Sequence, residues 1–330
     1  MKIQSLVFPG KDQCLVEATT IPDNPGTGEV LIRNRLSLIS AGTELAMFTE
    51  THRGFAEADF SYASYPFRPG YAVVGEVVAA GDGVSDLAPG TRVFHRSRHA
   101  THALLSHDVV LPVPEGVPDS HVPFIAMLQI AMSAPRQAPV YFGENVLVIG
   151  MGLAGNLCAQ LCASAGAGRV AAADLAAPRL AQALACGADV VFDLSEKPLA
   201  DWLPEFGPRG ANYVVEAVGS GPTIDLALKA AARHGRVVLL GSPRDKLELD
   251  PYFDIHRTGV HVIGAHASTV DAATREQDMP FLWSLLATGR INVEPLISHV
   301  LPYTEGQKAY EGLRDRKDEF LGVLLEYPED

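Results

Sequence analysis

The sequence predicts an α/β fold, with a β-rich N-terminal part and a second part built as a doubly wound parallel sheet. Residues 30–38 alternate apolar and polar side chains, as in a half-buried strand. A glycine-rich turn follows the apolar run 146–149. From residue 145 onward, strand-like runs alternate with helical stretches, which is typical of a parallel sheet covered by helices on both faces.

The strongest functional signal is the stretch 145–174. Its apolar run leads into GMGLAG (150–155), a G-x-G-x-x-G pattern. Gly150 permits a tight turn, Gly152 leaves room for a pyrophosphate, and Gly155 lets the next helix pack closely on the strand. Asp174 ends the following strand, 19 residues after Gly155, where a carboxylate binds a ribose 2′-hydroxyl. The stretch predicts a dinucleotide site with its phosphates at the positive end of the helix.

Two other interpretations of this stretch are a simple glycine-rich turn and a membrane span, since the apolar segment is long. The glycines, the polar Asn156 and Gln160 and the charged residues at both ends argue against a span. The distance between the glycines and the acid favours the dinucleotide site over a simple turn.

The composition narrows the classes of function. The chain has 330 residues, 47% hydrophobic and 20% charged, which suits a globular protein with two domains. Its net charge of −13 argues against nucleic-acid or membrane partners, because both need basic surfaces. The N-terminal apolar run is too short for a signal peptide, and the four cysteines form no C-x-x-C motif. We therefore expect a cytoplasmic protein with free thiols and a small-molecule substrate.

The expected elements follow in order. Residues 1–120 are expected to be mostly strands, with a turn at 40–44 and a long loop over 55–68. Residues 69–93 are typical of a small barrel with glycines at its corners. A helix is expected over 120–132, before Pro135 and Pro139.

Beyond residue 145 the alternation is regular. Expected strands are 146–149, 169–173, 190–192, 213–216, 237–240 and 260–263, and expected helices include 157–165, 180–185 and 223–232. The tail carries a short helix over 309–313 and a strand over 320–327. Right-handed crossovers place a ligand at the carboxyl ends of the parallel strands.

Several motifs together resemble the medium-chain dehydrogenase/reductase superfamily, which includes alcohol and polyol dehydrogenases. They are SAGTE (40–44), PGYAVVGEVVAAG (69–81), PGTRV (89–93), VLVIGMGLAG (146–155), the block 174–189, VVEAVG (214–219) and GRVVLLG (235–241). The resemblance covers nearly the whole chain. It implies a GroES-like β-barrel catalytic domain over 1–140 and 298–330 and a Rossmann dinucleotide-binding domain over 141–297. It also implies a homodimer, paired through the edge strand 260–263.

The zinc ligands of that superfamily are missing at the matching positions. The cysteine of the first motif is Ala41, and the histidine of the second is Tyr71. The third ligand should fall within 124–132, which holds no Cys, His, Asp or Glu, and the four-cysteine lobe is missing too. Because catalytic zinc needs three good N, S or O ligands, we expect a zinc-independent member without a metal site. Among zinc-free relatives, S-x-G-T-E most resembles the bacteriochlorophyllide dehydrogenase type.

Hydroxyl groups are the candidates to replace zinc, because hydride transfer needs the substrate oxygen to be polarised or deprotonated. Thr43 matches the hydroxyl that relays the proton in the family; the alternative is a turn threonine bonded to its own backbone. Tyr71 could donate to the substrate oxygen, or merely fill the space of the lost histidine. Glu44 either orients a neighbouring group or forms an ion pair on the domain surface.

Histidines supply the other catalytic candidates. Residues 95–102, HRSRHATH, form a basic cluster that begins at His95 and ends at His102. Its arginines oppose a cation, so contact with an anionic or polar substrate is favoured over a metal, and a solvated loop is the alternative. His266 follows a stretch that the family brings near the nicotinamide, and it is either a proton relay or structural.

The expected cofactor is NAD, because Asp174 would repel the 2′-phosphate of NADP. Arg179 could meet that phosphate, so NADP is the alternative. The resemblance implies further contacts from the glycine-rich loop, from the strand ends beside the nicotinamide ribose and from one residue near the nicotinamide. These residues are Gly150, Gly152, Leu153, Ala154, Gly155, Val218, Gly219, Leu240, Gly241, Ser242, Gly264, Ala265 and Gln129.

The leading hypothesis is a zinc-independent, NAD-dependent oxidoreductase that interconverts a secondary alcohol and a ketone. The second is an NADPH-dependent enone or quinone reductase, which a comparison of NADH and NADPH binding would identify. The third is a catalytically silent nucleotide-binding protein, because the zinc site is lost. NADH oxidation with a panel of ketones separates this last hypothesis from the other two.

Overall fold

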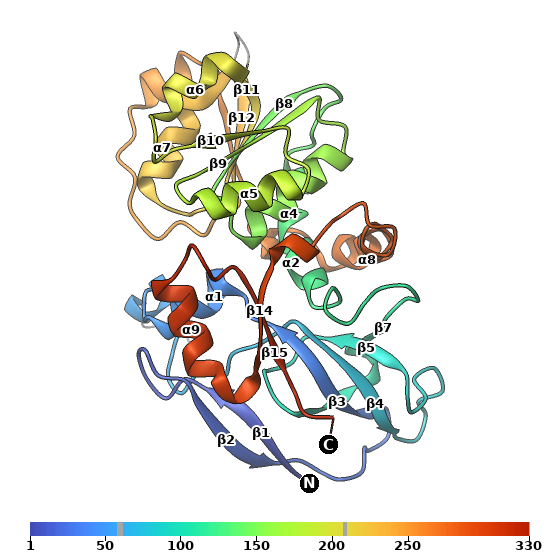
Figure 1. Ribbon diagram of the computed structural model, residues 1–330. Helices are drawn as coiled ribbons and strands as arrows, with labels where there is room; N and C mark the ends of the chain where they lie inside the picture. The colour runs from blue at the N-terminus through green and yellow to red at the C-terminus, as the bar shows by residue number, and fades with distance from the viewer. Residues whose placement is uncertain (58–61, 207–209, 330) are drawn as a thin grey trace. The chain divides into compact units, whose positions relative to one another are not determined.

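The computed structural model describes residues 1–57, 62–206 and 210–329, and its contacts divide the chain into two compact units. One unit combines Met1–Ala126 with Ile297–Asp330, and the other is Met127–Leu296 (Figure 1). The helix α2 (Phe124–Ala131) crosses the first division. Residues 127–140 therefore belong to the second unit, whereas the sequence predicts the boundary after residue 140.

The first unit is built mostly from antiparallel strands around a long central strand, β3, with β14 and β15 paired in parallel. Its main sheet has the order β14-β15-β3-β4-β5-β7, with β6 also paired to β3, and a separate pair β1-β2. The strands are β1 (Lys2–Val7), β2 (Leu15–Thr20), β3 (Glu29–Leu38), β4 (Val73–Ala80), β5 (Arg92–His95), β6 (His102–Ser106), β7 (Val110–Pro112), β14 (Ile297–Pro302) and β15 (Gly322–Glu326). The chain returns from the second unit to pair β15 with β3, which Figure 1 shows in red beside blue.

Two apolar cores hold the first unit together. Alternate residues of β3, such as Val30 and Ile32, pack with Val77 of β4 and Val93 of β5. The other core gathers aromatic rings around the helices α1 (Ala41–Phe48) and α9 (Gly306–Asp315). The short helical turns are η1 (Arg53–Ala56), η2 (His107–Val109) and η6 (Tyr303–Glu305).

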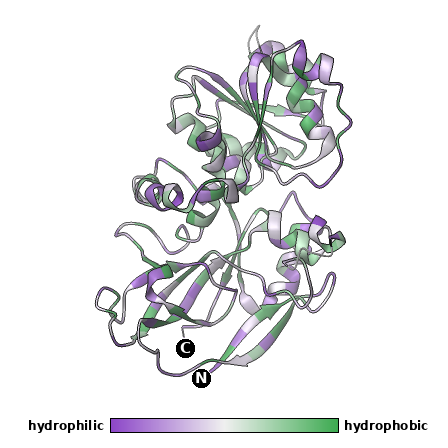
Figure 2. Ribbon diagram, turned by 180° about the vertical axis from the view of Figure 1, so that it is seen from behind, coloured by the Kyte–Doolittle hydropathy of each residue, from purple (hydrophilic) through white to green (hydrophobic). Residues whose placement is uncertain are grey.

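The second unit is a parallel sheet with the order β10-β9-β8-β11-β12-β13. The strands are β8 (Asn145–Ile149), β9 (Arg169–Asp174), β10 (Val190–Asp193), β11 (Ala211–Glu216), β12 (Ala231–Leu239) and β13 (His261–Gly264). They are mostly hydrophobic (Figure 2), as expected for strands buried on both faces. The chain direction across the sheet reverses between β8 and β11, and this switch point is where open α/β sheets bind ligands.

Helices cover both faces of this sheet. Leu147 and Ile149 of β8 pack in a core with residues of α6 and α7, while Val146 and Val148, which point to the opposite face, are fully buried as well. The helices are α3 (Ser133–Gln137), α4 (Leu153–Ser164), α5 (Ala177–Ala185), α6 (Leu199–Phe206), α7 (Gly221–Ala230) and α8 (Ala272–Ala287), with helical turns η3 (Pro251–His256), η4 (Ala267–Thr269) and η5 (Glu294–Leu296). The predicted fold class is confirmed.

The turn expected at residues 40–44 is wrong. These turn-forming residues instead begin the helix α1, because Met47 and Phe48 at its end are buried in the aromatic core. Tertiary packing therefore overrides a weak local preference. The sequence analysis does not predict the long helix α8, whose buried residues begin only at Asp278 and which has Pro280 in its interior.

Two helical glycines provide a test of this packing. A Cβ on Gly312 of α9 would overlap the ring of Phe320, which is held between His299 and Arg316. Overpacking costs roughly 1–3 kcal/mol, and alanine gains about 1 kcal/mol over glycine in a helix. We therefore expect Gly312→Ala to lower the free energy of unfolding by up to about 2 kcal/mol in urea titrations.

Gly42 of α1 is the matched control, because a Cβ there meets no atom within 4 Å. Gly42→Ala should raise the free energy of unfolding by up to about 1 kcal/mol. A Gly312→Ala protein as stable as the Gly42→Ala protein would contradict the packing described here.

Candidate active site

The glycine-rich loop joins β8 to α4 in the second unit, and its three glycines differ in what a side chain at their position would meet. Gly150 has a φ of +93°, which side-chain-bearing residues rarely adopt. A Cβ on Gly155 would overlap the carbonyl oxygen of Gly150, so only glycine allows α4 to lie this close to the loop. A Cβ on Gly152 would meet nothing within 4 Å, so the loop backbone is open at this point. A pyrophosphate needs this kind of open backbone.

Two side chains hold the peptide groups of Met151 in this loop. Asp174 Oδ2 accepts a hydrogen bond of 2.6 Å from the Met151 N–H, and its Oδ1 accepts from the Ala176 N–H. Asn156 Nδ2 donates to the Met151 carbonyl at 2.7 Å. Arg179 approaches Asp174 to 4.0 Å. The acid expected to bind a ribose is thus in contact with the loop, and Asn156 is a supporting residue that the sequence analysis missed.

The end of β11 contains a second missed residue, Glu216, which is fully buried. Its Oε1 accepts from the N–H groups of Val218 and Gly219 and from the Thr223 hydroxyl. Its Oε2 is buried without a hydrogen-bond partner. Glu216 therefore fixes the turn whose residues were expected beside the nicotinamide ribose. The only signal in the sequence is an acid at the end of an otherwise apolar strand.

The backbones at the ends of β11 and β12 are packed tightly together. A Cβ on Gly219 would overlap the Ser242 carbonyl, and a Cβ on Gly241 would overlap the Gly219 amide. Val218 remains half exposed beside them, and Leu240 is almost fully buried. The strand ends that the sequence singled out are therefore brought together within this unit.

The remaining candidates of this unit follow β13 or lie on α2. Ala265 is buried, and its carbonyl accepts from Ser133, whereas a Cβ on Gly264 would meet open space. Gln129 donates its amide to the Arg275 carbonyl of α8 at 3.0 Å, so the structure gives it a structural partner. His266 is exposed, and its Nδ1 accepts from the Ser268 N–H at the start of η4.

Three hydroxyl groups meet in the first unit. Tyr71 Oη donates to Ser40 Oγ immediately before α1, and the Thr43 side chain also hydrogen-bonds to Tyr71. The pKa of Tyr71 is raised to about 12, mainly by burial and to a smaller extent by the charge of Glu44, against the lowering effects of the two hydroxyls and Arg96. The phenol therefore stays protonated at ordinary pH. Thr43 and Tyr71, predicted separately, lie in one cluster.

Glu44 is buried, with 1% of its surface exposed, so the expected alternative of a surface ion pair is wrong. Its Oε2 accepts from Tyr310 Oη and lies 3.0 Å from His99 Nε2, and its Oε1 accepts from the Ser40 N–H. His99 Nδ1 in turn lies 2.7 Å from Ser37 Oγ.

A serine, a histidine and a carboxylate in this order are also the components of a hydrolase triad. Ser37 has no exposed surface and is bonded to Tyr327 as well, so a substrate cannot reach it. The arrangement therefore supports a structural network.

The basic cluster of residues 95–102 is not a solvated loop. His95 and His99 have no exposed surface, whereas Arg96 and Arg98 are exposed. His95 Nε2 bonds to Asn34 at 2.9 Å, and burial lowers the pKa of His95 to about 3. His95 is therefore neutral and out of reach of a substrate, which corrects its prediction as a catalytic contact. His102 bonds to its neighbour Thr101.

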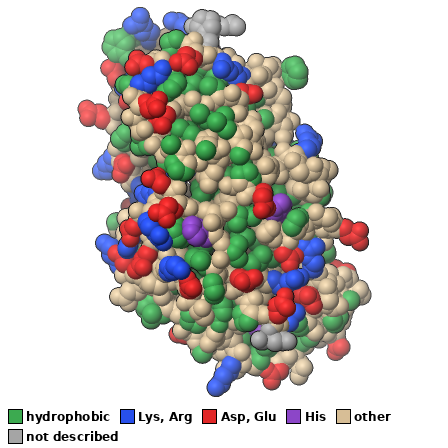
Figure 3. All heavy atoms as spheres, in the orientation of Figure 1, with side chains coloured by type: hydrophobic (Ala, Val, Ile, Leu, Met, Phe, Trp, Pro, Cys, Tyr) green, Lys and Arg blue, Asp and Glu red, His purple; other side chains and the backbone are tan. Residues whose placement is uncertain are grey.

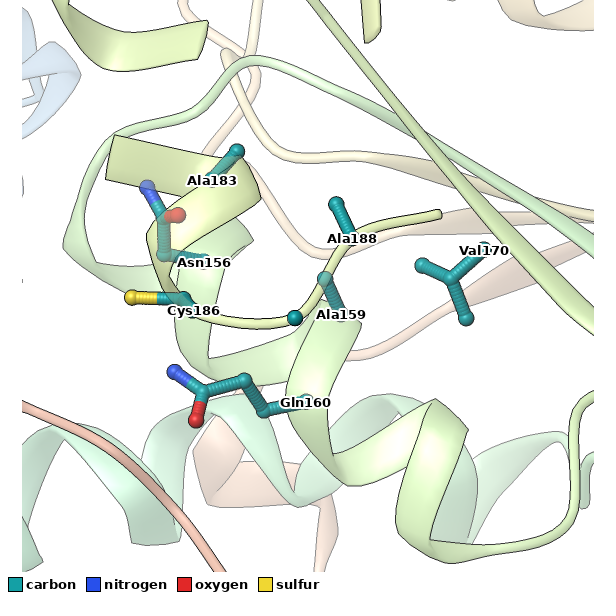
Figure 4. A pocket seen from close by; sticks show the side chains of 8 residues that line it. Asn156, Ala159, Gln160, Val170, Ala183, Cys186 and Ala188 are labelled. Atoms are coloured by element: carbon teal, nitrogen blue, oxygen red, sulfur yellow. The ribbon is translucent and has the colours of Figure 1, made fainter. Parts of the chain in front are cut away.

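A small cavity of about 10 Å³ lies behind the glycine-rich loop, between α4 and the end of α5 (Figure 4). It is lined by Asn156, Gln160 and Cys186, among others, and the Asn156 Oδ1 has no partner. Burial raises the pKa of the Cys186 thiol to about 11, so it is a poor nucleophile at neutral pH. The space suits one water molecule and no substrate.

The positions expected for zinc ligands contain no suitable donors. Ala41 begins α1 with a methyl group, Tyr71 keeps its proton, and α2 is apolar apart from Gln129. Within residues 1–57, 62–206 and 210–329, no group of three His, Cys, Asp or Glu side chains is arranged to hold a metal ion.

The surface charge and the helices can also be compared with what a basic binding surface or a membrane span would need. Acidic and basic side chains are intermixed on the face shown in Figure 3. Among the helices that the structure describes, none is long and apolar enough to cross a membrane.

Comparisons with known proteins agree with this architecture. Residues 154–287 match the family model described as zinc-binding dehydrogenase, and residues 26–110 match the alcohol dehydrogenase GroES-like domain. Galactitol 1-phosphate 5-dehydrogenase of Escherichia coli (strain K12) is 27% identical over 270 residues, which cover 71% of this chain and 77% of that protein.

Solved structures show the same fold. The crystal structure of galactitol-1-phosphate dehydrogenase from Escherichia coli superposes with a TM-score of 0.82 at 23% identity, covering 98% of this chain and 99% of that one. A structure described as a short chain alcohol dehydrogenase from Escherichia coli CFT073, complexed with the cofactor NADH, gives 0.82 at 20% identity over 99% of both chains. Together with the two matching domain models, these similarities show that the chain belongs to the medium-chain dehydrogenase/reductase superfamily of alcohol dehydrogenase-like oxidoreductases.

Proposed function

We propose that this protein is a zinc-independent, NAD-dependent oxidoreductase that interconverts a secondary alcohol and a ketone. The observation that carries the proposal is the cluster of Ser40, Thr43 and Tyr71 hydroxyls, which lies in the two motifs where the superfamily resemblance expects zinc ligands. Such hydroxyls can hold a substrate oxygen and pass a proton.

A pyridine nucleotide fits the second unit. The open backbone at Gly152 leaves the room that a pyrophosphate needs, and the N-terminus of α4 favours its negative charge. Asp174 is proposed to bind the ribose, and Val218 with Gly219 to border the nicotinamide end. When bound, the nicotinamide supplies the hydride acceptor or donor. Solved structures of similar fold with NADP or NADH bound support a pyridine nucleotide as the cofactor.

Zinc does not fit the residues present, although one matching family model is described as zinc-binding. A methyl group at Ala41 cannot bind a metal, and a phenol with a pKa near 12 is a poor ligand at neutral pH. In the proposed reaction, Thr43 and Tyr71 hold the oxygen of the substrate. Alcohol oxidation releases the hydroxyl proton of the substrate, which these hydroxyls pass on to solvent, so the rate of oxidation should rise toward alkaline pH.

A homodimer and a cytoplasmic location complete the proposal. The edge strand β13 is exposed, with 42% of Val262 accessible, and exposed apolar edge strands are commonly paired. Free thiols at all four cysteines are consistent with a reducing compartment.

The cofactor preference is testable by titration. We expect NADH to bind more tightly than NADPH by about 1.5–3 kcal/mol, because Asp174 bonds a ribose hydroxyl and repels a 2′-phosphate. Asp174→Asn keeps one oxygen acceptor for the backbone but removes the charge, so it should reduce the difference in binding free energy between NADH and NADPH. Fluorescence titration of both nucleotides measures this. Equal affinities in the wild type would favour the enone or quinone reductase hypothesis.

The hydroxyl cluster is testable by kinetics. Thr43→Val and Tyr71→Phe should each lower kcat at least ~100-fold, the lower end of the range for a placed acid–base group. NAD affinity should stay nearly unchanged, because neither residue lies in the cofactor unit. Wild-type turnover in both variants would refute the assignment, and His102 and His266 would be tested next.

Metal analysis is the control for this experiment. Protein purified without a histidine tag should contain substoichiometric zinc, and chelators should leave its activity intact. One tightly bound zinc per chain would overturn the hydroxyl mechanism, whatever the two variants show.

Light scattering tests the dimer. We expect a dimeric mass at micromolar concentration and a shift toward monomer in Val262→Lys, because a charge on β13 opposes edge pairing. Val300→Lys is the matched control, since Val300 is half exposed on the edge strand β14 of the other sheet. A monomeric wild type, or dissociation by Val300→Lys alone, would exclude pairing through β13.

A further inference from the structure

Glu44 lies one residue after Thr43 in the first turn of α1 and is almost completely buried. A buried carboxylate loses several kcal/mol of hydration unless donors replace the lost water. Here three donors do so: the Ser40 N–H, His99 Nε2 and Tyr310 Oη. The carboxylate therefore connects the start of α1 to the helix α9, through Tyr310, and to the segment after β5, through His99.

A second layer fixes the histidine. His99 Nδ1 lies 2.7 Å from Ser37 Oγ of β3, and Ser37 Oγ lies 2.8 Å from Tyr327 Oη. A continuous chain of hydrogen bonds therefore runs from Tyr327 through Ser37 and His99 to Glu44. His99 is thus held in one ring orientation by side chains that have almost no exposed surface.

The hydroxyl cluster lies at the open end of this network. Ser40 gives its N–H to Glu44 and its Oγ accepts from Tyr71, so one residue joins the buried carboxylate to the phenol. The backbone amide of Ser40 cannot relay a proton onward to Glu44. The connection therefore acts through position and charge.

We propose that Glu44, held by His99 and Tyr310, is a positioning residue that fixes Ser40, Thr43 and Tyr71 and places a negative charge behind them. The proposal rests on the function proposed above, because it assigns a purpose to the geometry of the hydroxyl cluster. Glu44 itself has no surface on which to contact a substrate.

The charge of Glu44 has a defined effect on Tyr71. Burial is the main cause of the raised pKa of Tyr71, and Glu44 adds to it. The Ser40 and Thr43 hydroxyls and the exposed Arg96 act in the opposite direction. Removing the Glu44 charge should therefore lower the pKa of Tyr71, and removing the Arg96 charge should raise it.

The direct test is a titration of Tyr71 in the full-length protein. Replacing tyrosine by 3-fluorotyrosine lowers phenol pKa values into an accessible range, and Tyr71→Phe assigns its ¹⁹F signal. Glu44→Gln should shift the titration of Tyr71 to lower pH, Arg96→Gln should shift it to higher pH, and Glu44→Asp should restore most of the wild-type behaviour. An unchanged titration in folded Glu44→Gln protein would overturn the proposal.

Kinetics then separates this proposal from the proposed function. Glu44→Gln should lower kcat about 10–100-fold, as expected for displaced reacting groups, with little change in NADH affinity. Its effect should be smaller in a Tyr71→Phe background, because only the Ser40 and Thr43 hydroxyls then remain for Glu44 to position. An additive loss in the double variant would overturn the proposal.

Wild-type kcat in Tyr71→Phe, with a shifted Tyr71 titration in Glu44→Gln, would instead refute the proposed function and leave the positioning intact. Should Glu44→Gln fail to fold, Ser37→Ala probes the same network, because it loosens His99 without touching the carboxylate. A changed ¹⁹F chemical shift of Tyr71 in Ser37→Ala would support the proposal. An unchanged shift together with an unchanged kcat would contradict it.

Discussion

Carboxylates that accept backbone N–H groups fix three of the candidate segments of this protein. Glu44 holds the Ser40 amide at the start of α1, Asp174 holds the Met151 amide in the glycine-rich loop, and Glu216 holds the amides of the turn after β11. A charge-assisted bond to an amide is stronger than a neutral one, and it is directional. Loops that would otherwise sample many conformations are therefore held in one before any ligand binds.

Burying a carboxylate removes part of its hydration, and the three carboxylates differ in what replaces the lost water. Asp174 remains partly accessible, so water shares in its solvation. Glu44 is buried but has three donors. Glu216 is fully buried with one oxygen lacking a partner, and such a group costs about 1–3 kcal/mol. A buried acceptor without a partner at the switch point of the sheet is consistent with a functional site there.

The features that could be predicted from the sequence depend on residues close together in the chain, whereas those that could not depend on contacts between distant residues. The glycine-rich loop was recognisable because its main requirements are local: Gly150 has a positive φ, and Gly155 lies close to the carbonyl of Gly150. The alternation of β8 to β13 with helices was likewise predictable from apolar periods. These features depend on neighbours in the chain.

The environment of the histidines and of Glu44 was not predictable in this way. Glu44 meets Tyr310 across 266 positions, and His99 meets Ser37 across 62. Periodicity carries no information on such pairs, so residues 95–102 looked like a charged surface although two of their histidines are buried. Long-range packing also explains α1: its sequence is typical of a turn, but its last residues are buried in the aromatic core and the segment is helical.

The loss of zinc ligands changes what the rest of the first unit must do. A metal cation stabilises an alkoxide by its charge, and it tolerates some variation in position because the Coulomb interaction falls off slowly with distance. A neutral hydroxyl acts through a hydrogen bond, which weakens steeply when the distance or angle departs from its optimum. In the proposed mechanism, catalysis by Thr43 and Tyr71 therefore depends on rigidity more than zinc catalysis does. The buried network around Glu44 and His99 supplies that rigidity, and it does so from the interior, where water cannot compete for its hydrogen bonds.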